Sequence, residues 1–211
     1  MDNLNSKNYT IYHIAHEQFV QKHRFKCKLL PDEEIHLIDG SGYPSFSKLI
    51  NTCVVNCPTE TVIIFSYKVY PFPDQIEKIL KYLNEGYAFV GLHRFAFFGF
   101  KKELMRKIGF FDERFVLGGC EDEDFLLRMK EVNLGFYMSH ESIVSNEYSG
   151  WTSQFSEERP TASYKHFVAK WKKFSDGKKI QLKRQISDEI YDYDLGPSTG
   201  ENFIPWKKSL I

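Results

Sequence analysis

The sequence predicts an α/β fold in which helices flank a mainly parallel central sheet. Segments rich in β-branched and aromatic residues alternate with segments whose apolar residues recur every three or four positions, the rhythm of a layered α/β domain. Residues 61–65 form a continuous apolar run, typical of a parallel strand covered on both faces. Of the 211 residues, 42% are hydrophobic and 27% charged, which indicates a globular chain.

The first half of the chain contains three predicted strands and two predicted helices. Ser45 precedes a helical pattern and is a candidate N-cap, and Asp74 is positioned to cap a second helix that Gly86 closes. The strands are short, β-branched and aromatic. We therefore predict strands at residues 9–15, 34–39 and 61–65, and helices at residues 45–55 and 74–85.

The second half continues the alternation and ends in a different composition. From about Ser156 the chain becomes polar and basic, and an irregular tail with Asp, Gly and Pro follows. We read residues 179–211 as an arm that wraps over the domain, or as a linker, and not as a second domain. The other predicted elements are extended segments at residues 87–91, 95–98 and 136–138, and helices at residues 101–108, 121–132 and 164–174.

Charge and cysteine content restrict the classes of partner. The chain has 28 Lys and Arg against 28 Asp and Glu, so it lacks the basic excess of a general nucleic-acid binder or of a protein held to an anionic membrane. Its four cysteines are irregularly spaced, which favours a reducing compartment, and no apolar run is long enough for a signal peptide or a membrane span. We expect a cytoplasmic protein with a small or neutral partner.

A run of acidic residues carries the strongest functional signal. Glu121, Asp122, Glu123 and Asp124 follow the pair Gly118-Gly119 and Cys120, and they open a predicted helix. Acidic side chains are stabilised at helix N-termini, so some of them could be no more than caps. The alternative is chemical, because glycines let a ligand approach the backbone and a rigid helix start can hold one carboxylate against a reacting hydroxyl.

Residues 118–128, together with residues 108–115, resemble the acceptor-side motif of inverting GT-A glycosyltransferases of the family-2 type, with Cys120 as one extra residue. The resemblance extends over about residues 10–150 and implies a single GT-A, Rossmann-like domain over residues 1–178. It also implies that Asp122 is the general base that deprotonates the acceptor hydroxyl. Glu121 would contact the acceptor sugar.

The donor side of the same family is matched less closely. Residues 11–16 resemble the first strand and its exit loop, and residues 35–41 resemble the end of the second strand. The resemblance implies donor contacts at Ala15, His16, Asp39 and Gly119, at the carboxyl ends of parallel strands where such sheets bind ligands. For Asp39 the alternative is a turn-forming residue before Gly40.

The chain departs from the family at the metal site. Residues 69–74 match the segment that follows the family's Asp-x-Asp motif, so Ser66, Tyr67 and Lys68 occupy the metal position, and Asn146 stands where the family has a histidine. Mg²⁺ and Mn²⁺ prefer hard oxygen ligands, which a lysine cannot replace. We therefore expect no essential metal or other cofactor, with Lys68 neutralising the donor diphosphate. The alternative is that Mn²⁺ or Mg²⁺ is recruited through other groups.

Two interpretations are open for several further residues. His16, His93 and Arg94 follow predicted strands on the ligand side, whereas the other histidines read as packed or surface residues. Trp151 lies where a mobile loop could stack on a sugar ring. Residues 164–171 resemble a family ending that packs a helix on the sheet. The aromatic run reads as core, with a sugar platform as the alternative; it consists of Phe95, Phe97, Phe98 and Phe100.

The combined reading is an inverting hexosyl- or deoxyhexosyltransferase of glycan biosynthesis. It would use a nucleoside diphosphate donor, expected to be a UDP-sugar, and a carbohydrate acceptor. One rival is a non-catalytic module that binds nucleotide-sugars or glycans on the same fold. A nucleotidyltransferase is disfavoured because no glycine-rich phosphate loop is visible near the N-terminus. The composition resembles that of glycosyltransferase domains from large DNA viruses and from bacterial polysaccharide clusters. A viral origin would place the protein in the host cytoplasm.

Overall fold

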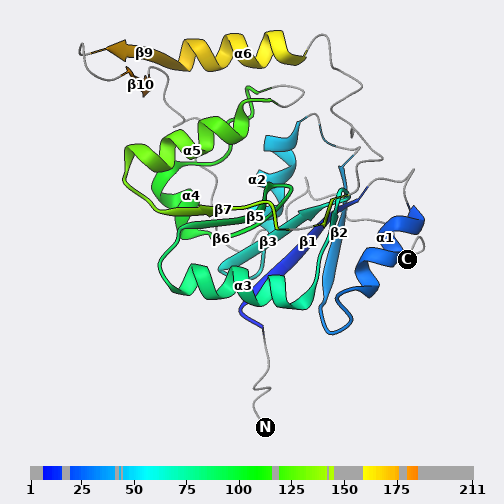
Figure 1. The fold of residues 1–211 in the computed structure, drawn as a ribbon. Coiled ribbons are helices and arrows are strands. Elements are labelled where there is room, and N and C mark those ends of the chain that lie inside the picture. Colours follow the sequence, from blue (N-terminus) through cyan, green and yellow to red (C-terminus); the bar gives the residue numbers. More distant parts are fainter. Residues whose placement is uncertain are drawn as a thin grey trace.

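A six-stranded sheet forms the centre of the domain (Figure 1). The computed structural model describes residues 7–15, 20–40, 43, 45–115, 119–141, 143–144, 159–175 and 180–184. Within them the strand order is β2-β1-β3-β6-β5-β7. The strands are β1 (Tyr9–Ala15), β2 (Ile35–Asp39), β3 (Thr61–Ser66), β5 (Phe89–Phe95), β6 (Phe97–Lys101) and β7 (Phe136–Met138).

Five of these six strands run in one direction, and β6 alone runs against them. Ala15 lies opposite Asp39, and Ile14 opposite Ser66, so β1, β2 and β3 end at the same edge of the sheet. The prediction of an α/β fold with a mainly parallel sheet is confirmed.

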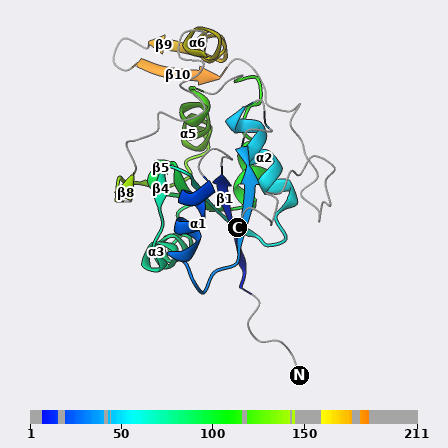
Figure 2. The ribbon, with the colours of Figure 1, turned by 90° about the vertical axis from the view of Figure 1, so that its right-hand side faces the viewer.

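Helices cover both faces of the sheet (Figures 1 and 2). Apolar side chains of α2, α4 and α5 share one buried cluster with the sheet, and those of α3 share a second cluster on the opposite face. The helices are α1 (Val20–Lys28), α2 (Phe46–Asn56), α3 (Pro73–Asn84), α4 (Glu103–Ile108), α5 (Glu121–Glu131) and α6 (Arg159–Lys170).

Strand β3 shows why its sequence is continuously apolar. Val62 and Ile64 belong to the cluster under α2, α4 and α5, whereas Ile63 and Phe65 belong to the cluster under α3. All four side chains are fully buried. Each such burial stabilises the fold by about 1.5–3 kcal/mol before conformational entropy is counted. Both faces of β3 therefore need apolar residues, as predicted.

The helix starts confirm one predicted cap and correct another. Oγ of Ser45 accepts the amide hydrogen of Lys48 at 3.2 Å, so Ser45 is the N-cap of α2. In α3, Pro73 is the first helical residue, and the amide of Phe72 donates to the side chain of Gln75 at 3.0 Å. Asp74 lies inside the first turn and is not the cap, because the fixed φ of Pro73 lets the helix begin one residue earlier.

Three parts of the structure differ from the predicted elements. Helix α1 was not predicted because few of its residues are apolar. The helix predicted at residues 164–174 ends at Lys170, and β9 (Trp171–Ser175) pairs antiparallel with β10 (Ile180–Arg184). The expected start of the arm, at residue 179, falls between these two strands, and the arm beyond residue 184 lies outside the described residues. The short strands β4 (Val69–Tyr70) and β8 (Ile143–Val144) also pair.

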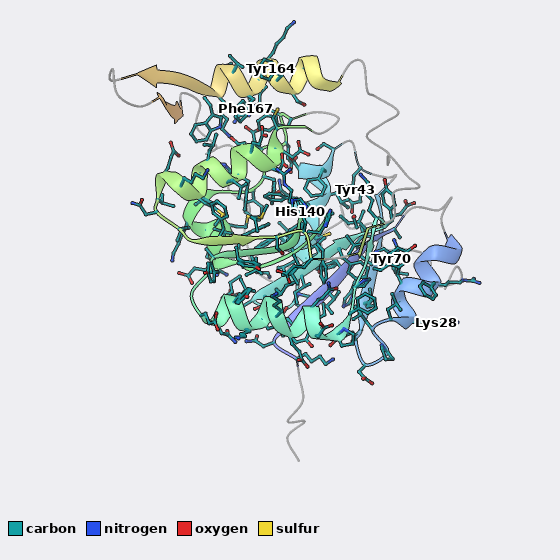
Figure 3. The ribbon with its side chains drawn as sticks, in the orientation of Figure 1. Lys28, Tyr43, Tyr70, His140, Tyr164 and Phe167 are labelled. Atoms are coloured by element: carbon teal, nitrogen blue, oxygen red, sulfur yellow. The ribbon has the colours of Figure 1, made fainter. Side chains whose placement is uncertain are left out.

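Helix α6 lies beside α5 and not on the sheet as the family resemblance implied (Figure 1). Phe167 points from α6 toward α5 (Figure 3). Across the described part of the chain, we find no helix with the length and apolar character needed to cross a membrane.

Candidate functional site

A pocket of about 480 Å³ opens at the edge where β1 and β3 end. It lies at the carboxyl ends of parallel strands, the position at which open α/β sheets bind ligands. The turn between β5 and β6 and the beginnings of α2 and α5 complete its walls.

The pocket brings together most of the predicted site residues. One predicted donor residue is placed differently: Asp39 ends β2 opposite Ala15 and does not line the pocket, whereas its neighbour Gly40 does. His16 and Trp151 lie outside the described residues, as does Asn146. The predicted residues that line the pocket are Ala15, Ser66, Tyr67, Lys68, Gly119, Glu121 and Asp122.

Two left-handed residues place the start of α5 at the pocket. Gly119 has φ 99° and Cys120 has φ 67°, so the extra residue of the motif takes up a conformation that side chains disfavour. The strain costs about 1–2 kcal/mol for a residue other than glycine. The carbonyl of Cys120 accepts the amide hydrogen of Asp124 at 2.9 Å and thereby starts the helix. Glu121 and Asp122 consequently occupy the first turn, where the helix dipole favours carboxylates.

Of the two acids of this turn that line the pocket, Asp122 is the accessible one. Its side chain is 32% exposed, one carboxylate oxygen accepts the amide hydrogen of Glu123 at 3.0 Å, and the other lies 3.8 Å from a guanidinium nitrogen of Arg94. Glu121 is buried beside it, with 8% of its surface exposed. Asp122 is therefore held in place by the helix start and remains open to a ligand in the pocket.

The acid run divides between the pocket and the interior. Asp124 is fully buried and accepts from Arg128 at 3.0 Å and from the indole nitrogen of Trp171 at 2.7 Å. The ammonium of Lys170 lies 2.8 Å from the same carboxylate. Asp124 is thus not a helix cap but the anchor that joins α5 to α6 and β9.

A second buried carboxylate shares this lysine. Asp112 accepts from Arg114 at 2.7 Å and from Lys170 at 2.9 Å, and Nε2 of His166 lies 3.0 Å away. Burial opposes ionisation of Asp112, but these partners outweigh it and hold the pKa of Asp112 well below its usual range. The motif therefore has two parts. Asp112 and Asp124 bind Lys170 and thereby fix α6, whereas Glu121 and Asp122 line the pocket.

Basic side chains line another part of the pocket. Lys68 follows β3, and His93 and Arg94 come at the end of β5. Burial first, and then the charges of His140, Arg94 and Lys68, lower the pKa of His93. The sequence placed His93 and Arg94 on the ligand side, and the structure confirms that they reach the pocket.

The remaining pocket walls were not predicted. Tyr43 and Phe46 line the pocket near the start of α2, and nothing in their local sequence separates them from core residues. The aromatic run is confirmed as core, since its four members are at most 8% exposed. Phe95 is the member that also borders the pocket.

The residues at the expected metal position do not form a suitable ligand set for Mn²⁺ or Mg²⁺. Ser66, Tyr67 and Lys68 offer a hydroxyl, a phenol and an ammonium, and an ammonium has no lone pair for a metal. Among the described residues, moreover, no cluster of three or more His, Cys, Asp or Glu side chains could hold a metal ion.

Comparison with known proteins identifies the fold. No family model and no curated protein sequence matches the chain. Among solved structures, it is similar to a mutant of Drosophila β1,4-galactosyltransferase 7 in complex with manganese, UDP-Gal and xylobiose, with a TM-score of 0.54, 10% identity, and coverage of 87% of this chain and 96% of that one. The catalytic domain of the same Drosophila enzyme with xylobiose matches at the same identity and coverage, with a TM-score of 0.49. The chain thus has the GT-A fold of glycosyltransferases.

Proposed function

We propose that the protein transfers a sugar from a UDP-sugar to a carbohydrate acceptor, with inversion at the anomeric carbon. The observation that carries this proposal is the placing of Asp122 and Lys68 in one pocket at the carboxyl edge of a GT-A sheet. The resemblance of residues 108–128 to the acceptor motif of inverting enzymes supports the same reading. The structural neighbour binds UDP-Gal and xylobiose, which supports a donor and an acceptor of these two classes.

Asp122 would act as the general base. It would take the proton of the acceptor hydroxyl while that oxygen attacks the anomeric carbon and the diphosphate leaves from the opposite face. The carboxylate suits this task because it is fixed at the helix start and partly exposed. Glu121, at the previous position, would orient the acceptor sugar.

Lys68 would stabilise the leaving group. Negative charge develops on the diphosphate as the sugar departs, and a positive group close to it lowers the barrier. In many GT-A enzymes a divalent ion supplies this charge, but Ser66, Tyr67 and Lys68 at the corresponding position do not suit one. We therefore place no metal in the reaction, and the ammonium of Lys68 supplies the charge.

The second candidate function is a binding module without turnover. The observation that favours it is the lack of carboxylates at residues 66–68, the family's metal position. An enzyme that had lost catalysis would also have lost these metal ligands. Such a module would bind a nucleotide-sugar or a glycan in the same pocket. It would not depend on Asp122 for affinity.

Two measurements test the proposal. Nucleoside diphosphate sugars are first screened by thermal shift, because a ligand that binds only the folded state raises the unfolding temperature. Donors that bind are then incubated with oligosaccharide acceptors in the presence of a chelator, and the released nucleotide and the new glycosidic bond are measured. Transfer with inverted stereochemistry supports the enzyme. Binding with neither transfer to any acceptor nor hydrolysis of the donor favours the module.

A further inference from the structure

Three basic side chains, Lys68, His93 and Arg94, form what we call the basic rim of the pocket. They come from two segments of the chain that backbone hydrogen bonds join directly. The amide of Ser66 donates to the carbonyl of Ala96 at 2.8 Å, and the amide of Ala96 donates to the carbonyl of His93 at 2.9 Å. The end of β3 and the turn between β5 and β6 therefore hold the rim at a fixed spacing.

The segment after β7 fixes this turn from the other side. The amide of Arg94 donates to the carbonyl of Ser139 at 3.3 Å, and that of Glu141 donates to the carbonyl of Leu92 at 2.9 Å. Arg94 itself has φ 47°, in the left-handed region. Strained backbone held by its surroundings is frequent at binding sites. The backbone that carries the basic rim is thus fixed by the strands and the segment around it.

His93 has unused hydrogen-bonding capacity within this rim. His93 lines the pocket, and its Nδ1 atom is buried with no hydrogen-bond partner in the described part of the chain. Buried polar atoms without a partner are rare and call for an explanation. The partner we assign to this Nδ1 atom is a ligand in the pocket that His93 lines, which requires the imidazole to turn toward that space.

The groups around His93 are mainly cationic. Arg94 follows it on β5, Lys68 faces it from the end of β3, and His140 packs against it from the segment after β7, with ring centroids 5.1 Å apart. The nearby acid Glu141 is engaged elsewhere, by Lys78 and Tyr137, and Asp122 pairs with Arg94. In the empty pocket burial, and after it these cationic groups, disfavour a protonated imidazole and lower the pKa of His93. A bound anion carrying two or more negative charges would favour the imidazolium and raise the pKa of His93.

We propose that the basic rim is a diphosphate-binding site in which His93 contacts the diphosphate and takes up a proton from solvent when it binds. This inference rests on the proposed function for the identity of the ligand. The imidazole becomes an imidazolium on binding, and the proton returns to solvent when the diphosphate leaves. The charge that a metal would bring to a diphosphate is then shared by Lys68, Arg94 and a histidine that is charged only while the site is full.

The test uses inorganic pyrophosphate, with the full chain and a chelator present. Titration calorimetry in two buffers of different ionisation enthalpy counts the protons taken up by the wild type, by His93→Gln and by His36→Gln. His36 lies on β2 away from the pocket and is the matched control. We expect His93→Gln to weaken binding about tenfold at pH 6.5 and less at pH 8.5, because a hydrogen bond to a charged group is lost. The variant should also take up fewer protons than the wild type.

A measurement on the wild type alone covers the case in which His93→Gln does not fold. The imidazole of His93 is titrated by NMR with and without pyrophosphate, and its pKa should rise when the ligand is present. The proposal is overturned if wild type and His93→Gln bind with equal affinity and equal proton uptake, if the His93 pKa does not move, or if the wild type does not bind pyrophosphate. Sugar transfer with an unaffected His93→Gln contradicts this inference alone, whereas pyrophosphate binding without transfer contradicts only the transferase.

Discussion

The guanidinium of Arg94 lies 3.8 Å from the carboxylate of Asp122, so the turn between β5 and β6 meets the start of α5 across the pocket. Both sides are built on disfavoured backbone, with left-handed φ angles at Arg94 and at Cys120. Strain of this kind persists only where the surrounding structure imposes it. The proposed base and the basic rim therefore face one another across one pocket.

Replacing Asp122 by Asn should strongly reduce transfer and preserve donor binding. The amide cannot accept the proton of the acceptor hydroxyl, so we expect turnover to fall at least about 10²-fold. The matched control is Glu123→Gln, because Glu123 is the exposed neighbour on the same helix turn and does not line the pocket. Steady-state transfer assays and calorimetry with the donor measure the two effects. Equal turnover of Asp122→Asn and wild type would exclude the proposed base.

Lys68 should be required whether or not metal is present. If its ammonium supplies the charge at the diphosphate, wild-type turnover survives exhaustive chelation, and Lys68→Met loses about 10²-fold or more in turnover, the scale of removing one electrostatic contact to a developing charge. Lys81→Met, on the exposed side of α3, is the control and should keep full activity. Loss of wild-type activity on chelation, restored by Mn²⁺, would contradict a metal-free reaction.

Gly91 should be essential for the position of the basic rim. A Cβ atom at this residue would lie 2.7 Å from the carbonyl oxygen of Arg94 and 2.8 Å from the sulfur of Met138, so Gly91→Ala must displace the turn. Overpacking of this kind costs about 1–3 kcal/mol of stability. We also expect pyrophosphate affinity to fall about tenfold, the effect of losing one charged contact.

The control for this substitution is Gly135→Ala, whose Cβ would meet its nearest neighbour, a ring atom of Tyr87, at an ordinary 3.9 Å. Thermal unfolding and calorimetry should show little change for that variant. Gly91→Ala with wild-type affinity would mean that the turn can move without altering the basic rim.

The sequence predicts the layered fold because the spacing of apolar residues along the chain matches the pattern of buried side chains in the structure. In β3 the alternate side chains enter two different clusters, which requires an uninterrupted apolar run. The same logic fails for α1, whose sequence is mostly polar, and for β9, whose residues continue the preceding helix without a break in pattern. Local pattern cannot show pairing with β10, because that pairing depends on a partner outside the segment.

The location of a candidate residue was predictable where it follows from a position in a motif. Asp122, Glu121 and Lys68 were placed in this way, and all three line the pocket. The different role of Asp124 was hidden, since its partners Lys170 and Trp171 lie far along the chain. Contacts between residues more than 40 positions apart leave no mark in the spacing of either segment.

The shared lysine predicts a large and specific loss of stability. Lys170 is fully buried between the carboxylates of Asp112 and Asp124, so Lys170→Met leaves two buried negative charges with one cation fewer. Breaking a buried ion pair from one side costs about 3–5 kcal/mol. Denaturant unfolding measures the change, and Lys165→Met, at an exposed position of the same helix, should change stability by less than about 0.5 kcal/mol. A similar small effect for Lys170→Met would show that α6 is not held by this network.

Asp112 should make stability depend on pH in the acid range. Because its partners hold the pKa of Asp112 below the value of an unfolded chain, about 3.9, the folded state favours the carboxylate. This contribution is complete above about pH 5 and is lost as the pH falls toward the folded pKa. Asp112→Asn should therefore be less stable than the wild type at pH 7, and its free energy of unfolding should change less between pH 5 and pH 2. Denaturant unfolding across that range measures both, with the exposed Asp32→Asn as control. Equal slopes for Asp112→Asn and wild type would mean that the carboxylate is not preferentially ionised in the fold, and that the attachment of α6 to α5 does not depend on its charge.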